Sequence, residues 1–439
     1  MDPGPLRRYP VRVDLAYGED HRRGCETPEA AIDVGQTQSM SGGRVLGIVS
    51  LATILALSIW FSINAIGPAL EREKGLSTSD LAWLTIAVQI GFVVGTLVSA
   101  YLNLADRIRP RALFAVTAVV GAMLNAAVVP LESFGWVLFV RFATGMALAG
   151  VYPTAMKIVS GWFQRARGAA LGTMIAALTL GSGSPHLLRS VFVDNWEATV
   201  FGSSLLAVGG GLLVLGFGAD GPFDVKGARF DPRIMLKTLT DRGQRLILLG
   251  YLGHMWELYA MWAWIGAFLG SVYGARSVLG GGLELSSALA FAVFGAGAVG
   301  SVLGGVVADR HGRTLTTSVA MVLSGGSALV IGFMPVDWTL AIGLVALIWG
   351  AAVIADSAQF STAITELSEP QYWGTALTFQ TGLGFAVTAF AIWLIPVLEE
   401  AGGWGIAWAV LAVGPGLGTI AMLRLRALPE SLRLAGGRR

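Results

Sequence analysis

The chain has 439 residues, of which 54% are hydrophobic and 13% charged, with a formal net charge of +2 and a mean hydropathy of +0.67. Soluble domains carry about 25% charged residues, so this composition excludes a soluble globular protein. It predicts an all-α, polytopic membrane protein that lies in a lipid bilayer. The small net charge gives no reason to expect a nucleic-acid partner. Cys25 is the only cysteine, which excludes an intrachain disulfide.

Residues 1–43 precede the first apolar run. They are polar, contain no apolar segment of the kind found in a secretory signal, and cannot bury a core. We therefore expect a disordered cytoplasmic tail. Met40 stands directly before the first apolar run, so translation could begin at Met1 or at Met40.

Twelve apolar runs follow, each long enough to cross a bilayer as an α-helix. The expected spans are 45–69, 81–103, 112–130, 135–157, 168–190, 197–218, 246–270, 285–307, 315–334, 338–359, 375–397 and 404–424. The polar segment 219–245 links an N-terminal half, 44–218, to a C-terminal half, 246–424, each with six spans. Residues 425–439 form a cytoplasmic C-terminal tail.

Lysine and arginine are distributed unevenly around these spans. With twelve spans, 25 of the 30 Lys and Arg residues fall on the side of the two termini and four fall on the opposite side. Positively charged loops stay in the cytoplasm. We therefore predict that both termini are cytoplasmic and that the protein lies in the cell membrane as a multi-pass protein.

The two halves contain similar segments at similar positions. Asp106-Arg107 follows span 2, and Asp309-Arg310 follows span 8, 203 residues later. An internal repeat of this kind predicts two parallel six-helix halves with a binding site between them, near the midplane of the bilayer.

The segment Gly304–Arg313, with the sequence Gly-Gly-Val-Val-Ala-Asp-Arg-His-Gly-Arg, resembles the signature loop between helices 8 and 9 of the major facilitator superfamily of secondary transporters. The first-half copy departs from the pattern, with Asn103 and Pro110 where glycines are usual. The resemblance covers residues 44–424 and implies transport by alternating access. It also implies a cytoplasmic gate of charged side chains, for which a plain surface ion pair is the alternative. The gate residues are Asp106, Arg107, Asp309, Arg310 and Arg313.

Three further polar residues lie inside spans. Arg141 belongs to Arg-Phe-Ala-Thr-Gly in span 4, similar to an Arg-x-x-x-Gly element of the family that implies proton coupling; snorkelling to the outer interface is the alternative. His186 follows Gly181–Pro185 in span 5, a segment that departs from the antiporter element of drug exporters and so argues against efflux. His186 lines the cavity or simply ends the helix. Asp356, near the cytoplasmic end of span 10, is expected to join the gate by pairing with an Arg or Lys there; contact with the substrate is the alternative.

Span 7 places His254 and Glu257 three residues apart, on one face of the helix. Ionisable side chains inside a bilayer are costly unless they face a cavity or a partner, and they tend to be functional. We predict that Glu257 exchanges a proton and that His254 shares this proton or binds the substrate. The alternative is a structural pair packed against another helix.

Aromatic and amide side chains in spans 1, 4 and 7 are suited to surround a small polar substrate. Helix packing through the same residues is the alternative. We expect the wall of the substrate cavity to contain Trp60, Asn64, Tyr152, Trp256, Tyr259 and Trp262.

The predicted function is proton-coupled uptake of a small organic or inorganic anion. Two alternatives stay open: proton-driven export of amphipathic compounds, and a transporter-like receptor that binds without flux. In overall character the chain is nearest to nitrate/nitrite and oxalate:formate porters, although the Asn-Met-Gly element of nitrate porters is absent. Phosphate-binding loops, paired metal-ligand motifs and a nucleophile elbow are also absent. We therefore expect a monomer that is not an enzyme and uses no cofactor and no metal.

Overall fold

The computed structural model describes residues 41–102, 104–163, 167–222, 237–274, 277–278, 283–369 and 372–438. The expected tail therefore lies almost wholly outside the described residues, as does most of the expected linker. The described chain is α-helical apart from one pair of two-residue antiparallel strands. The helices coincide with all twelve predicted spans, which confirms the all-α polytopic fold.

The first six spans are formed by the helices before residue 218. Span 1 is interrupted in the middle by a 3-10 turn, and α6 is the shortest span. The bounds are α2 Gly42–Ala56, η1 Leu57–Ile59, α3 Ser62–Lys74, α4 Thr78–Leu102, α5 Leu104–Arg107, α6 Pro110–Ala126, α7 Phe134–Ser160, α8 Arg167–Val191 and α9 Trp196–Phe217.

The last six spans begin inside the expected linker, at Arg242. Span 10 is interrupted at Asp356, and span 12 begins within α16, after a kink at Gly402 and Gly403. The bounds are α11 Arg242–Tyr273, β1 Ser277–Val278, β2 Leu283–Glu284, α12 Leu285–His311, α13 Arg313–Ile331, α14 Thr339–Ala355, α15 Ser357–Leu367, α16 Trp373–Leu411, α17 Val413–Arg426 and η3 Pro429–Gly437.

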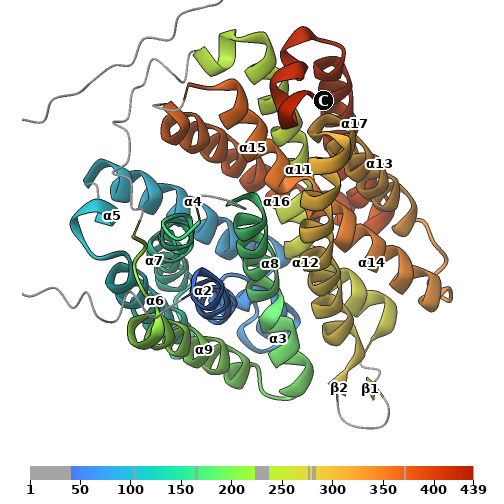
Figure 1. Cartoon of the computed structure of the whole chain (residues 1–439). Helices are drawn as coiled ribbons and strands as arrows, with labels where there is room; N and C mark the ends of the chain where they lie inside the picture. Colours follow the sequence, from blue (N-terminus) through green and yellow to red (C-terminus); the bar gives the residue numbers. More distant parts are fainter. Residues whose placement is uncertain are drawn as a thin grey trace, which may run out of the picture. The chain divides into compact units, whose positions relative to one another are not determined.

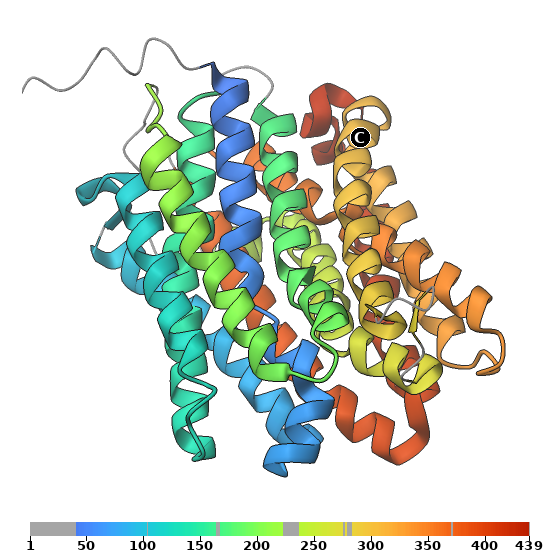
Figure 2. The same ribbon diagram turned by 90° about the horizontal axis from the view of Figure 1, so that it is seen from below.

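The helices divide into two groups along the chain. Figure 1 shows α2 to α9 on one side of the bundle and α12 to α17 on the other. The groups meet where α4 packs on α16, α8 on α12, and α3 on α11. We call this surface of contact the seam. Figure 2 shows that α2 begins at the same end of the bundle at which the C-terminus lies; we call this end the chain-end side and the opposite end the far side.

Glycines bring backbones into direct contact within each group. A Cβ atom on Gly91 of α4 would lie 2.0 Å from the carbonyl oxygen of Phe142 in α7, and one on Gly145 would lie 2.1 Å from that of Val88. Helices α12 and α14 approach in the same way through Gly300, Gly304 and Gly350. Such contacts hold neighbouring helices together without a hydrophobic driving force in lipid.

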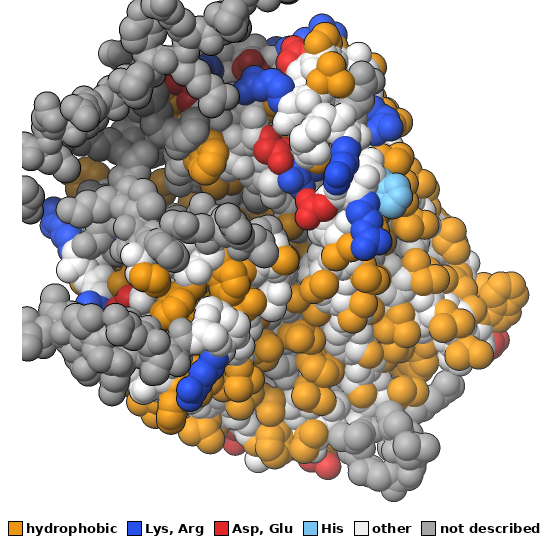
Figure 3. Space-filling view, in the orientation of Figure 1, with side chains coloured by type: hydrophobic (Ala, Val, Ile, Leu, Met, Phe, Trp, Pro, Cys, Tyr) orange, Lys and Arg blue, Asp and Glu red, His pale blue; other side chains and the backbone are white. Residues whose placement is uncertain are grey.

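The outer faces of the helices are apolar. Figure 3 shows apolar side chains covering the visible face over α12, with charged side chains gathered near the C-terminal segment. Val299, Leu303 and Leu344 are each more than half exposed. Within the described residues, eight runs of helix are long and apolar enough to cross a membrane, and α6 is a shorter apolar helix. The protein is therefore a multi-pass membrane protein.

Candidate functional site

Aromatic rings from both groups of helices meet at the seam. Trp60 lies just after η1, where span 1 is interrupted, and its ring centroid is 6.2 Å from that of Tyr259 in α11. Trp262 lies one turn further along α11, 5.4 Å from Tyr259. We call the continuous set of touching rings the seam cluster. Its members are Trp60, Phe61, Phe92, Tyr259, Trp262, Phe294 and Phe385.

Asn64 lies on the far side of this cluster and joins the two groups. Its Nδ2 donates to Thr85 Oγ1 at 2.9 Å and to the carbonyl oxygen of Ala263 in α11 at 3.1 Å. A pocket of about 210 Å³ begins at Asn64, and its lining includes Glu71 and Glu399. Asn64 therefore lies between this pocket and the seam cluster and links the two groups of helices there.

One of two other residues expected in the same wall lies close to it, and the other lies elsewhere. Tyr152 in α7 is half-buried; it makes no described ring contact with the seam cluster, but it interacts electrostatically with Tyr251 and with Tyr259 of the cluster. Trp256 packs on α16, with its ring 5.9 Å from Phe390. Its indole Nε1 donates to the carbonyl oxygen of Val410 at 3.1 Å. A buried indole N–H usually finds an acceptor, and the acceptor that Trp256 finds lies within its own group of helices.

Glu257 points away from the seam into the second group. Its carboxylate accepts a hydrogen bond from Trp349 Nε1 in α14 at 2.8 Å and another from Ser324 Oγ in α13 at 2.8 Å. The side chain is buried, and both donors are neutral groups. Glu257 is therefore a carboxyl group inside the bundle whose described contacts include no cation.

His254 shares the helix face of Glu257, as predicted, but has a different partner. His254 Nδ1 lies 2.8 Å from Asp356 Oδ1, and both side chains are almost fully buried. The expectation that Asp356 pairs with a cation of the gate is wrong, because it pairs with this imidazole at the interruption of span 10. His254 and Glu257 do not share a partner, so the expected direct sharing of a proton has no support in these contacts.

Arg141 is fully buried, which excludes snorkelling. Its guanidinium donates to the carbonyl oxygens of Ile59 at 3.2 Å and Trp60 at 2.8 Å. It also donates to Ser62 Oγ at 3.2 Å and Asn125 Oδ1 at 3.1 Å. The interruption of span 1 leaves backbone carbonyls without helical partners, and Arg141 supplies the missing donors.

His186 is buried at the seam on α8. Its ring lies 5.8 Å from that of Phe294, and a Cβ atom on Gly266 of α11 would be 2.6 Å from its Cε1. Its Nε2 has no hydrogen-bond partner in the described part of the chain. The structure thus places His186 beside the seam cluster, in contact with helices of the second group.

The gate residues are only partly brought together. Arg313 donates two hydrogen bonds to Glu366, at 2.8 and 2.7 Å, and one to Gln359 at 2.8 Å. Asp309 is mostly exposed and lies 3.7 Å from Arg313, and Arg310 is exposed. Gln359 and Glu366 were not predicted to belong to the gate, although Gln359 shares a helical face with Asp356 and Glu366 follows Gln359 two turns later. Arg107 is exposed, and the side chain of Asp106 lies outside the described residues.

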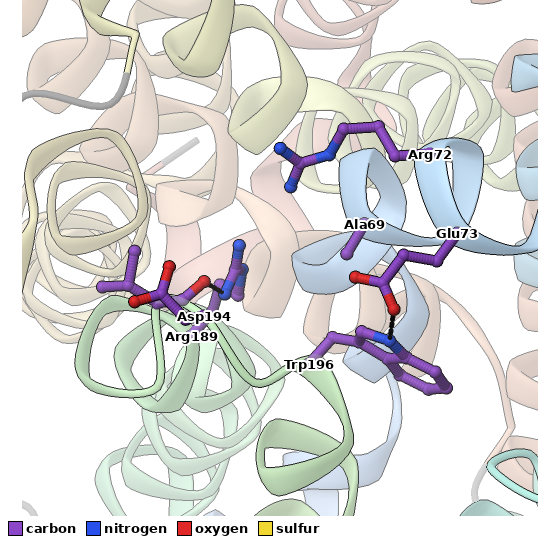
Figure 4. Close-up of a pocket in the computed structure, with 7 residues that line it drawn as sticks. Ala69, Arg72, Glu73, Arg189, Asp194 and Trp196 are labelled. Carbon is purple, nitrogen blue, oxygen red and sulfur yellow. Dashed lines mark hydrogen bonds between the residues drawn. The ribbon is translucent and has the colours of Figure 1, made fainter.

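A second pocket, of about 330 Å³, lies on the far side between α3 and the ends of α8 and α9. Figure 4 shows Arg72 and Arg189 reaching it from α3 and α8. Glu73 accepts a hydrogen bond from Trp196 at 2.8 Å, and Asp194 also lines the pocket. Two cations and two carboxylates thus face one another, and this pocket shows no excess of either charge.

Two groups of spanning helices with polar groups buried between them are typical of a secondary transporter. A family model described as Major Facilitator Superfamily matches residues 49–355, so the chain belongs to this superfamily. Among the described residues, no three His, Cys, Asp or Glu side chains converge on a possible metal site.

Three known proteins illustrate the similarity. The chain is 24% identical over 156 residues to the galacturonate transporter of Dickeya chrysanthemi, an alignment that covers 35% of this chain and 45% of that protein. It is 23% identical over 412 residues to a protein of Cupriavidus necator described as a probable sulfoacetate transporter, SauU, covering 88% and 94%. The human organic anion transporter MFSD10 (TETRAN) has the same fold, with a TM-score of 0.63 and 15% identity over 88% of this chain and 100% of that one.

Proposed function

We propose that the protein takes up a small organic anion together with protons, by alternating access, as a monomer in the cell membrane with both termini in the cytoplasm. The observation that carries the proposal is the position of Glu257. This carboxyl group is buried among α11, α13 and α14, on a helix whose other side faces the seam, and is held only by neutral donors among its described contacts. A group of this kind can gain and lose a proton without breaking an ion pair.

Helix α11 links the proton to the substrate path. One side of the helix presents Tyr259 and Trp262 to the seam cluster, and another side presents Glu257 to α13 and α14. A change in the charge of Glu257 changes how strongly the carboxyl group holds Ser324 and Trp349. The same change therefore acts on the position of α11 and, through it, on the rings at the seam. In this proposal α11 is the element with two positions that coupling between proton and substrate requires.

The substrate class rests on the relatives and on a buried imidazole at the seam. The proteins similar to this chain include those named for galacturonate and for sulfoacetate, both of which are organic anions. His186 brings an imidazole with an unpartnered nitrogen to the seam. A protonated imidazole can bind a carboxylate or sulfonate.

The test is transport into proteoliposomes that contain a pH-sensitive dye, under an imposed proton gradient. The panel contains galacturonate, sulfoacetate, nitrate and the lipophilic cation tetraphenylphosphonium. We expect one of the organic anions to enter together with protons. Glu257→Gln is expected to lower accumulation at least tenfold while leaving exchange of substrate for substrate, because it keeps the shape of the side chain and removes the titrating group. Glu132→Gln, in an exposed loop, is the matched control.

Three outcomes would contradict the proposal. Accumulation that persists in Glu257→Gln would remove this residue from coupling. Proton movement with tetraphenylphosphonium alone would favour export of amphipathic compounds, for which the seven rings of the seam cluster are a suitable surface. Binding of an anion without any flux would instead favour a receptor.

A further inference from the structure

Two buried glutamines at the seam have amide groups that make no hydrogen bond. Gln89 in α4 and Gln380 in α16 are 0% and 1% exposed. Neither the Oε1 nor the Nε2 atom of either residue has a partner among the described residues. Each helix belongs to a different group, and α4 packs on α16 at the seam. An amide with both atoms unpartnered in the interior is unfavourable and requires an explanation.

Gln89 lies between the Asn64 contact and the seam cluster. It shares a face of α4 with Thr85, one turn toward the far side, and with Phe92, one turn toward the chain-end side. Thr85 accepts a hydrogen bond from Asn64, and the ring of Phe92 lies 4.9 Å from that of Trp60. The indole Nε1 of Trp60 is also without a partner in the described chain.

Gln380 lies on the other side of the same rings. It is one turn before Gly384 on α16, and a Cβ atom on Gly384 would lie 2.5 Å from the ring of Tyr251 in α11. The next residue, Phe385, touches Phe92 and Tyr259. Because α16 begins at the chain-end side, Gln380 lies on that side of the seam cluster and Gln89 on the far side.

We propose that Gln89 and Gln380 are substrate-binding residues that hold the polar group of the transported solute on the two sides of the seam cluster. Gln89 binds the solute when the seam opens toward the far side, and Gln380 binds it when the seam opens toward the chain-end side. The closed rings between them prevent both amides from being reached at once. In the closed protein the unpartnered amides are energetically unfavourable. They are kept because they bind the solute in the open states.

The inference rests on the proposed function and extends it to the chemistry of the solute. A primary amide offers two donors and an acceptor. It can donate to a carboxylate or sulfonate oxygen and accept from a hydroxyl. The pair of amides therefore suits a small organic anion that presents oxygen acceptors, and it offers no counter-charge that would retain the anion tightly after each step.

The first measurement is stability in detergent. Methionine is close to glutamine in length and has no strongly polar atom. If the amides have no partner within the protein, Gln89→Met and Gln380→Met will melt at the same temperature as the parent protein or higher. Gln359→Met is the matched control and is expected to melt lower, because the amide of Gln359 accepts a hydrogen bond from Arg313 at 2.8 Å.

The second measurement is transport from each side, in intact cells and in inside-out vesicles, with galacturonate and sulfoacetate as probes. With the termini in the cytoplasm, Gln89→Met is expected to raise the KM about tenfold from outside, the order expected for the loss of a hydrogen bond. Gln380→Met is expected to raise the KM by a similar factor from inside. Each variant should change the other side much less, which a merely structural role would not produce.

Several results would overturn the assignment. Unchanged transport from both sides in the two methionine variants would do so, and so would a fall in melting temperature as large as that of Gln359→Met. If the parent protein moves neither probe, the proposed substrate class fails; the sided comparison is then made with the member of the panel that the protein binds or moves. Failure of proton coupling is seen separately, in Glu257→Gln.

Discussion

Each group of helices buries an ionisable side chain in a similar place, but the two side chains differ in chemistry. Arg141 lies among the first, third and fourth spans of its group, and Glu257 contacts α13 and α14 from α11, the corresponding three spans of the other group. The arginine makes four hydrogen bonds, two of them to backbone carbonyls. The glutamate accepts two, both from neutral side chains.

The difference separates a fixed charge from an exchangeable one. A guanidinium stays protonated at any pH at which proteins fold, so Arg141 permanently satisfies the carbonyls that the interruption of span 1 sets free. A carboxyl group can change its charge, and the donors of Glu257 can release it. The first group of helices thus uses its charge to maintain a backbone shape, and the second is free to use its charge in the transport cycle.

The largest effect should come from Arg141→Lys. An ammonium group keeps the charge but cannot reach Ile59, Trp60 and Asn125 together from one point. Loss of these hydrogen bonds should lower stability by roughly 3 kcal/mol, measured as the melting temperature in detergent. Glu257→Gln is the matched comparison and should cost less than about 1 kcal/mol. Equal losses of stability in the two variants would show that Arg141 and Glu257 do not differ in structural role.

An intermediate effect is expected for the pair of His254 and Asp356. Asp356→Asn keeps an oxygen acceptor within reach of Nδ1 but removes the charge. We expect a loss of roughly 1–2 kcal/mol, the scale of one close polar contact in the interior. A double-mutant cycle with His254→Phe measures whether the two residues interact. Strictly additive losses would show that the 2.8 Å contact contributes nothing and would leave Glu257 as the only exchangeable charge of its helix.

The smallest effect should come from an ion pair outside the bundle. Lys237 and Glu369 are about half exposed, with Nζ 2.8 Å from Oε1. The hydrogen bond and the charge of Glu369 raise the pKa of Lys237. Because the pKa is higher in the folded state, the pair stabilises the fold at neutral pH, and this contribution is lost as the pH rises through that value. Lys237→Met should cost less than about 0.5 kcal/mol at pH 7, and the difference in melting temperature from the parent should vanish in strong alkali.

The spans could be predicted from the sequence because lipid demands long apolar helices, and this demand is visible in every run. The interruption of span 1 could not. Residues 57–61, Leu-Ser-Ile-Trp-Phe, contain neither glycine nor proline, and the turn there is stabilised by contacts from distant helices. Ser58, for example, donates to the carbonyl oxygen of Ser203 at 2.7 Å, 145 residues away.

The sequence predicted which residues lie near the seam better than it predicted which partners they contact. Helical spacing correctly placed His254 and Glu257 on one face, and aromatic content pointed to Trp60, Tyr259 and Trp262. The partner of each buried polar group depends on the depth and rotation of another helix. The spacing of residues within one helix gives no information on either. For this reason the pairing of Asp356 with His254 and the direction of Trp256 were missed, and the unpartnered amides could be found only from the packed structure.

The interruption of span 1 also has a consequence for biosynthesis. The carbonyl oxygen of Trp60 receives its hydrogen bond from a residue more than 80 positions later in the chain, and that of Ile59 receives one from the same residue in addition to one from Ser62 Oγ. When the ribosome has completed only the first span, that donor does not yet exist, and a bare carbonyl inside lipid is costly. The nascent span is therefore favoured as a continuous helix until the fourth span arrives, and the order of synthesis sets when the first span acquires its final shape.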